Sequence, residues 1–261
     1  MSKSSLFFTC AALGIVGVSA CGRMDLDEAA ANEAADSADV TETEGALVAS
    51  GVDDQAVALT AADIAAAAQV RAANRFQPAG CASVTVSGTT VTTTLADCTG
   101  RFGLLHVTGT IVSVFSDASD GVHVAATAHG LAVNRATLDI DATAVITEQG
   151  SVRTLTVTTQ GSGVGPRGNS FTRQGSYTIV RDLATSCIAV DGQWQLEVSG
   201  LSRTTTVTGL HRCDGACPAA GGEIVHTGFR GRTVTLTFDG TAEAAWTSST
   251  GHTGTISLAC N

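Results

Sequence analysis

The chain is poor in aromatic residues, has no lysine beyond its first positions and contains no run of basic residues. Aromatics make up 4% of its 261 residues, and the one lysine, Lys3, leaves arginine as the only other cationic side chain. Without a basic stripe, no nucleic-acid partner is expected. Neither a Gly-x-Ser-x-Gly nor a His-Glu-x-x-His motif occurs, and no nucleophile and base stand at a catalytic spacing. We therefore expect neither an enzyme nor a cofactor.

The first 20 residues have the three parts of a secretory signal peptide. Lys3 supplies the positive start, an uncharged apolar run ends at Val18, and two small residues precede Cys21. The run is too short for a transmembrane helix, and acidic chain follows it at once. The sequence predicts a signal peptide over residues 1–20.

The four residues Val18-Ser19-Ala20-Cys21 resemble the lipobox of bacterial lipoproteins. This resemblance implies diacylation of the Cys21 thiol and cleavage before it, so that lipid chains hold the mature protein on a membrane. Gly22 after the cysteine fits passage to the outer membrane, with the protein facing the periplasm or the surface. The alternative is an ordinary signal peptide with an incidental cysteine.

Residues 21–58 differ in composition from the rest of the chain. Positions 22–58 hold ten acidic residues against Arg23 alone, and no aromatic residue. Low hydrophobicity with one-sided charge predicts a disordered acidic tether after the lipidated Cys21, with a reach of roughly 35 Å. A partner-binding tail is the alternative. From Cys81 onward 13 acids face 10 arginines, a net charge of −3, so the overall charge of −10 belongs mainly to the tether.

A short helix is expected within residues 59–79. Thr60 and Asp63 have the spacing of a capping box, and an alanine-rich stretch follows from Ile64. Pro78 and Gly80 end it. Its apolar face is mostly alanine, which suits a helix lying against the edge of a domain.

From residue 80 to 261 the hydrophobic period is two, as in β-strands. Glycines recur every 8 to 13 residues in the second half, which indicates short strands joined by turns. The sequence thus predicts an all-β domain, an antiparallel meander of short strands preceded by one short helix, and leaves open a sandwich, a curved open sheet or a barrel. The clearest expected strands are residues 137–147, 152–159, 203–208 and 232–238.

Six cysteines remain once Cys10 leaves with the signal peptide and Cys21 carries lipid. An even number in an exported domain indicates three disulfides, for which 15 pairings exist. We favour the pairs that each enclose a predicted hairpin or small meander. These are Cys81–Cys98, Cys187–Cys213 and Cys217–Cys260.

Three clusters of side chains are candidates for chemistry. One cluster consists of His211, Cys213 and Cys217, which could bind zinc or take part in thiol exchange. An oxidising compartment favours structural disulfides at these cysteines, so we expect no metal. A three-histidine metal cluster could form from His106, His123 and His129. The alternative is that they are isolated histidines on the surface. Asp139 and Asp141 are expected on the same face of a strand, where they could form a calcium site or a glycosidase-like carboxylate pair. The alternative is that they only make this face soluble. The glycine-rich segment 161–170 is expected to be a flexible loop.

Threonine, with 37 residues, is the most conspicuous excess. Thr-x-Thr strands resemble ice-binding arrays and bacterial adhesin domains, although threonine is also the polar residue that strands tolerate best. Three segments of the domain are similar to Thr/Gly-rich, cysteine-bracketed lipoproteins of high-GC, myxobacterial-type genomes, a resemblance that implies no particular activity. They are Gly80-Cys-Ala-Ser-Val-Thr-Val-Ser-Gly88, Cys213-Asp-Gly-Ala-Cys-Pro-Ala-Ala-Gly-Gly222 and Ile256-Ser-Leu-Ala-Cys260.

The function expected from these observations is that of a lipid-anchored envelope protein with a non-catalytic binding, adhesion or structural role. The membrane is its expected partner through Cys21, and a protein or glycan partner is left open. The alternative is a lipid or lipoprotein carrier, in which a curved sheet cups an acyl chain in an apolar pocket. The scarcity of bulky apolar residues counts against the carrier.

Overall fold

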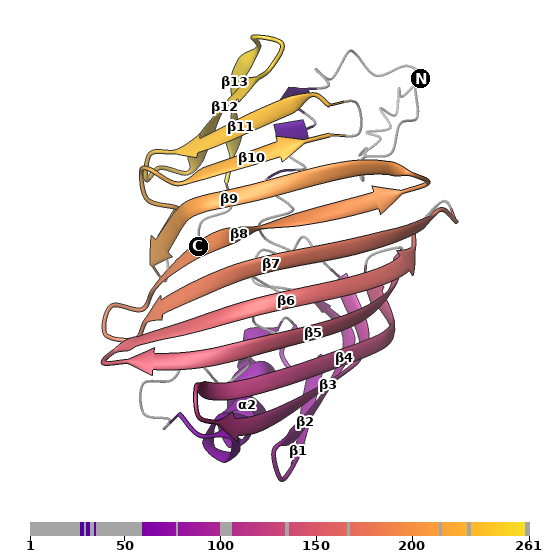
Figure 1. Cartoon of the computed structure of the whole chain (residues 1–261), viewed down its shortest axis with the longest axis vertical. Coiled ribbons are helices and arrows are strands. Elements are labelled where there is room, and N and C mark those ends of the chain that lie inside the picture. The colour runs from indigo at the N-terminus through magenta and orange to yellow at the C-terminus, as the bar shows by residue number, and fades with distance from the viewer. Residues whose placement is uncertain are drawn as a thin grey trace, which may run out of the picture.

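In the part of the chain that the structure describes, the strands form a single antiparallel sheet with a helix on its inner face (Figure 1). The computed structural model describes residues 27, 28, 30, 31, 34, 59–76, 78–99, 106–133, 136–165, 168–213, 216–228 and 231–258. Helix α2 spans Ala61–Arg75. The strands are β1 Ala82–Ser87, β2 Thr90–Thr99, β3 His106–Ala118, β4 Gly121–Val133, β5 Ala136–Gln149, β6 Val152–Val164, β7 Ser170–Asp182, β8 Cys187–Val198, β9 Leu201–Cys213, β10 Glu223–Thr227, β11 Thr233–Phe238, β12 Glu243–Ser248 and β13 Thr253–Ser257.

The 13 strands follow one another across the sheet in chain order, each antiparallel to the next. The expected all-β meander preceded by a helix is therefore confirmed. Of the three arrangements that the sequence left open, the molecule has the curved open sheet, with β1 and β13 at opposite ends of its long axis in Figure 1. Short turns between consecutive strands make such a meander the simplest antiparallel topology.

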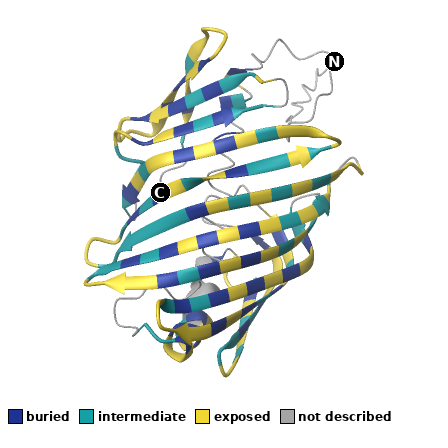
Figure 2. Cartoon of the chain, viewed as in Figure 1, coloured by how far each residue is buried: buried dark blue, intermediate teal, exposed yellow. Residues whose placement is uncertain are grey.

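Burial alternates along the strands (Figure 2). Most of the buried residues are apolar, and they form the inner face of the sheet. In β11, Val234, Leu236 and Phe238 are buried, while the threonines between them point outward. The same alternation in β5 places Ala142, Ala144 and Ile146 inside. A period of two on a half-buried surface produces this division, and it agrees with the faces expected from the sequence.

Helix α2 packs on the inner face against β1, β2 and β3, the strands at one edge of the sheet. Thr60 caps it, since its Oγ1 accepts a hydrogen bond from the Asp63 backbone N–H at 3.1 Å. Ala61, Ile64, Ala65 and Ala68 are at most 1% exposed and join the core formed with β2–β7. The helix thus lies against an edge of the domain, as expected from its alanine-rich apolar face.

Four aromatic residues of the inner face lie directly opposite glycines on the neighbouring strand. The register pairs Phe171 with Gly163, Tyr177 with Gly192, Trp194 with Gly175, and Trp246 with Gly254. A Cβ added to Gly254 would come within 2.8 Å of the Trp246 indole, and one at Gly163 would come within 2.7 Å of the Phe171 ring. The rings thus cover backbone that carries no side chain, a device that pins strand register.

These pairs correct two expectations about glycine. Gly192 and Gly209 lie inside β8 and β9, at or beside the bulge between these strands, and not in turns. Gly161 and Gly163 belong to β6, so the expected flexible loop over residues 161–170 is wrong at its start, since β6 continues to Val164. Glycine within a strand marks close packing at Gly161, Gly163 and Gly192 and a bulge at Gly209. Glycine spacing in the sequence does not distinguish these positions from turns.

Part of the predicted disordered tether is folded. Residues 27, 28, 30, 31 and 34 have helical backbone, and Asp27, Ala31 and Ala34 are 0% exposed. The alanines join the second core, which β8–β13 form around Trp194 and Trp246. At these positions the expectation of disorder is wrong, because local composition does not report a docking surface elsewhere in the chain. The other residues of the predicted tether, 21–58, lie outside the described residues.

Candidate functional site

The outer face carries rows of mostly small polar side chains. One row of directly paired residues crosses all 13 strands, and ten of its members are Thr, Ser or Gln. From β13 to β1 it consists of Thr253, Thr247, Thr235, Val225, Thr206, Gln193, Ser176, Thr158, Thr143, Ala125, Val114, Thr90 and Ser87. Each member is exposed or half-buried.

A second row places three amide side chains side by side. Gln160, Gln174 and Gln195 are direct neighbours on β6, β7 and β8, flanked by Thr204 on β9. Neighbouring rows on one face stand roughly 7 Å apart and neighbouring strands about 4.8 Å apart, so the surface offers a regular grid of hydroxyl and amide groups. Because the sheet twists and curves (Figure 1), this grid is not the flat lattice that ice binding requires.

The inner face carries arginines among its apolar residues. Five of the six arginines that the structure describes from Cys81 onward have inward positions in β6, β7 and β9, and they are buried or half-buried. They are Arg153, Arg173, Arg181, Arg203 and Arg212. Arg153 pairs directly with Arg181 across β6 and β7, and its Nε donates to Glu148 Oε2 at 2.6 Å. Burial lowers the pKa of Arg203.

His226 is a buried titratable group on the same face. It is 2% exposed on β10, and its Nδ1 is hydrogen-bonded to Thr205 Oγ1 at 2.9 Å. Burial, reinforced by the charge of Arg203, lowers the pKa of His226 to about 4. The imidazole is therefore neutral at pH 7, and it acts as part of the packed interior.

Asp27 is fixed on the inner side of β11–β13 by four side chains. Its carboxylate accepts hydrogen bonds from Thr250 Oγ1 at 2.6 Å, Ser248 Oγ at 2.8 Å, His252 Nδ1 at 2.8 Å and Arg232 Nη1 at 2.9 Å. Burial acts to raise the pKa of Asp27, yet the hydrogen bonds and the Arg232 charge together lower it to about 2. We call this carboxylate and its four partners the Asp27 latch.

Two of the three expected disulfides are present. Cys81 is bonded to Cys98, and Cys187 to Cys213. The second joins directly paired residues of β8 and β9 on the outer face. Cys217 is also a disulfide-bonded cysteine, but Cys260 lies outside the described residues, so their pairing stays a prediction.

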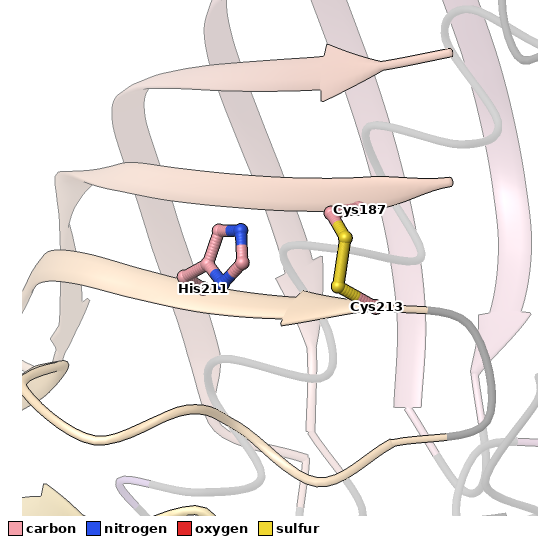
Figure 3. Close-up of side chains that lie close together, drawn as sticks. All are labelled: Cys187, His211 and Cys213. Atoms are coloured by element: carbon pink, nitrogen blue, oxygen red, sulfur yellow. A yellow bond between two sulfur atoms is a disulfide. The ribbon is translucent and has the colours of Figure 1, made fainter. Parts of the chain in front are cut away.

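His211 lies beside the Cys187–Cys213 disulfide on the outer face (Figure 3). The imidazole and the two sulfurs offer ligand atoms within 4.8 Å of one another, the one such group of three in the described part of the chain. Metals bind cysteine as thiolate, and neither sulfur is a thiolate while the bond is intact. The expected preference for a disulfide over a zinc site at Cys213 agrees with this geometry.

The structure does not bring the three candidate histidines together. Each has its own carboxylate within 4 Å: His106 Nδ1 lies 3.0 Å from Asp97, His123 Nε2 lies 2.8 Å from Asp120, and His129 Nδ1 lies 3.8 Å from Asp139. All six side chains are well exposed. They behave as the isolated surface histidines that we had weighed against a metal cluster.

Asp139 and Asp141 lie on the outer face, as expected, but they serve different purposes. Asp139 Oδ1 accepts the backbone N–H of Gly130 at 2.7 Å, where β4 bulges against β5. Asp141 stands between Thr127 and Gln160 in the register. A carboxylate that satisfies the irregular backbone of a bulge is a structural group, so Asp139 has a structural contact that the sequence did not predict.

Sequence reasoning missed the Asp27 latch and the inward arginines. The arginine signal was present: Arg153 shares the inward parity of Leu155 and Val157, and Arg203 that of Val207. The latch had no local signal, because Asp27 and its partners are more than 200 residues apart in the chain.

The lipobox, including Cys21, lies outside the described residues. No helix in the described part of the chain is long and apolar enough to cross a membrane. Comparison with protein-family models, with curated proteins and with solved structures finds no match. The interpretation of function therefore depends on the residues themselves.

Proposed function

We propose that this is a lipid-anchored cell-envelope protein whose sheet has a non-catalytic role in binding, adhesion or envelope structure. Lipid chains on Cys21 would hold it on a membrane, and Gly22 favours the outer membrane. The anchor is supported by the lipobox at the end of an uncharged apolar run. The disulfides at Cys81–Cys98 and Cys187–Cys213 fit an oxidising compartment.

The observation that carries the role of the sheet is the predominantly polar outer face. Small hydroxyl and amide groups repeat across all 13 strands, whereas the inner face is engaged in packing. A broad, regular surface of donors and acceptors suits contact with an extended polar partner such as a polysaccharide or a neighbouring protein. A compact substrate would instead need a concave site.

The packing of the inner face favours this role over that of a lipid carrier. A carrier needs an apolar cup open to an acyl chain. Here Ile64 and the alanines of α2 pack into the core at one end of the sheet, and Ala31 and Ala34 do so at the other. An acyl chain would have to displace the protein's own side chains at both ends.

The anchor is tested by acyl labelling. The full chain is expressed in a bacterial host supplied with an alkyne-bearing palmitate analogue, and labelling and membrane partitioning are measured. Wild type is expected to carry the label and to fractionate with membranes, and Cys21→Ser should lose both. Unchanged partitioning of Cys21→Ser would refute the anchor.

The outer face is tested on lipid-free protein with two purified probes, peptidoglycan and lipopolysaccharide. The double variant Thr143→Lys/Thr158→Lys places two bulky charges at the centre of the outer face. Ser119→Lys/Ala184→Lys adds the same charge in exposed turns as a matched control. We expect wild type and control to bind at least one probe, and the face variant to bind it at least about tenfold more weakly, about 1.4 kcal/mol. Equal loss in both variants, or binding to neither probe, would contradict a binding role of this face.

A further inference from the structure

The Asp27 latch fixes the beginning of the mature chain to one end of the sheet. Arg232 directly precedes β11, Ser248 ends β12, and Thr250 and His252 belong to the turn between β12 and β13. The Asp27 side chain is 0% exposed. Release of this carboxylate would leave one cationic and three further hydrogen-bond donors without it, so the contact is durable.

A second, apolar contact continues the same attachment. Ala31 and Ala34 are 0% exposed and join the core around Trp194 and Trp246. The spacing of three and four residues between Asp27, Ala31 and Ala34 places all three on one helical face. The latch and the alanines therefore hold the segment by a polar and an apolar contact at once.

Only six peptide units separate Cys21 from Asp27. Fully extended, they span at most about 22 Å. A free tether that ran to residue 58 would have an r.m.s. reach of roughly 35 Å and would leave the orientation of the domain undetermined. The latch shortens the effective tether to these six peptide units.

We infer that the β11–β13 end of the sheet forms the membrane-proximal end of the domain, held within about 22 Å of the lipid surface by the Asp27 latch. The inference rests on the proposed lipid anchor at Cys21. The opposite edge, with β1 and α2, lies 12 strand spacings away, about 58 Å along the sheet, at the other end of the long axis in Figure 1. The partner of the proximal end is a phospholipid surface.

The test measures energy transfer from a dye on the protein to a headgroup-labelled lipid in phosphatidylethanolamine–phosphatidylglycerol vesicles. Acylated full-length protein carries the dye on an unnatural amino acid, which leaves the disulfides intact. The labelled positions are Thr253 in β13 and Thr85 in β1, two exposed threonines of the outer face in the terminal strands. We expect at least roughly twofold more efficient transfer from position 253, because the two strands stand about 58 Å apart along the sheet.

Two variants separate the latch from the rest of the fold. A 20-residue Gly/Ser insertion between Arg23 and Met24 leaves every described contact intact and lengthens the tether to an r.m.s. reach of roughly 28 Å. Transfer from position 253 should fall towards the value at position 85. Asp27→Asn, which weakens the latch without changing the tether length, should move transfer the same way by a smaller amount.

The outcomes distinguish a failure of the proposed lipid anchor from a failure of the proposed orientation. Protein that carries no acyl label and does not float with vesicles would overturn the proposed anchor and this inference together. Protein that floats but shows equal transfer from both positions would overturn the orientation alone, as would an insertion that leaves transfer unchanged. Floating protein with higher transfer from position 253, lowered by the insertion, would establish it.

Discussion

Replacing Asp27 by Asn should destabilise the protein at neutral pH, and by less at acidic pH. The pKa of Asp27 is lowered from 3.8 to about 2 in the folded protein. A carboxyl with a depressed folded-state pKa stabilises the fold fully above its unfolded pKa, and this contribution is lost as the pH falls through the folded value. This lowering of the pKa corresponds to about 2 kcal/mol of stability at pH 7 and to about 1 kcal/mol at pH 3. Asn cannot ionise, so the variant lacks this contribution at every pH.

The measurement is urea unfolding of the lipid-free protein, followed by tryptophan fluorescence. Both tryptophans of the chain, Trp194 and Trp246, lie in the core that Ala31 and Ala34 join. Their emission therefore reports release of the N-terminal segment as well as global unfolding. Asp141→Asn, at an exposed carboxylate of the outer face, is the matched control and should change the free energy of unfolding by less than about 0.5 kcal/mol.

Three results would refute this reasoning. The first is a variant as stable as wild type at pH 7, which would mean that the carboxylate does not stabilise the fold. The second is a loss of equal size at pH 7 and pH 3, which would assign the effect to packing and not to charge. The third is an equal loss in Asp141→Asn, which would assign it to net charge.

Gly192→Ala should lower the free energy of unfolding by about 1–3 kcal/mol, because the new Cβ collides with Tyr177. The control Gly165→Ala, where the nearest atom is 3.6 Å from the added Cβ, should leave the free energy of unfolding nearly unchanged in the same urea titration. Peptide mapping without reductant should find Cys217 linked to Cys260, and Cys260→Ser should cost about 3–4 kcal/mol; a free thiol at Cys217 would contradict the pairing. Stability should be highest above pH 6.5 and fall as the pH drops towards 4, since the pKa of His226 is lowered to about 4 and its proton binds the unfolded chain more tightly. His226→Asn should flatten that part of the pH profile, and an unchanged profile would count against a buried neutral imidazole.

The strands and the helix were predictable because their signals are local. Alternation in residues 137–147 and 232–238 corresponds to β5 and β11 with the expected faces buried. The cap at Thr60 and the alanine-rich run after it likewise predicted α2. The β6 and β9 strands extend beyond residues 159 and 208, where glycine interrupts the period. In β6, Gly163 pairs with Phe171, and in β9, Gly209 lies at the bulge against β8. Spacing along one strand shows neither contact.

The cysteine pairs were predictable for a topological reason. In a meander, residues that flank one hairpin or a short run of strands lie close in space, so bracketing pairs are the natural pairs. Cys187 and Cys213 close the β8–β9 hairpin as direct partners. Cys81 and Cys98 enclose β1 and most of β2.

The N-terminal segment shows why charge is hard to interpret one window at a time. Taken alone, ten acids among 37 residues indicate repulsion and disorder. The sheet, however, places Arg153, Arg173, Arg181, Arg203 and Arg212 on its inner face, and a charge buried there is stable only with a counter-charge or hydrogen bonds. Asp27 with Arg232 is a described example of an N-terminal acid that the domain neutralises in this way. Acidic composition alone therefore does not predict that Asp27 is buried, because its counter-charge Arg232 lies 205 residues further along the chain.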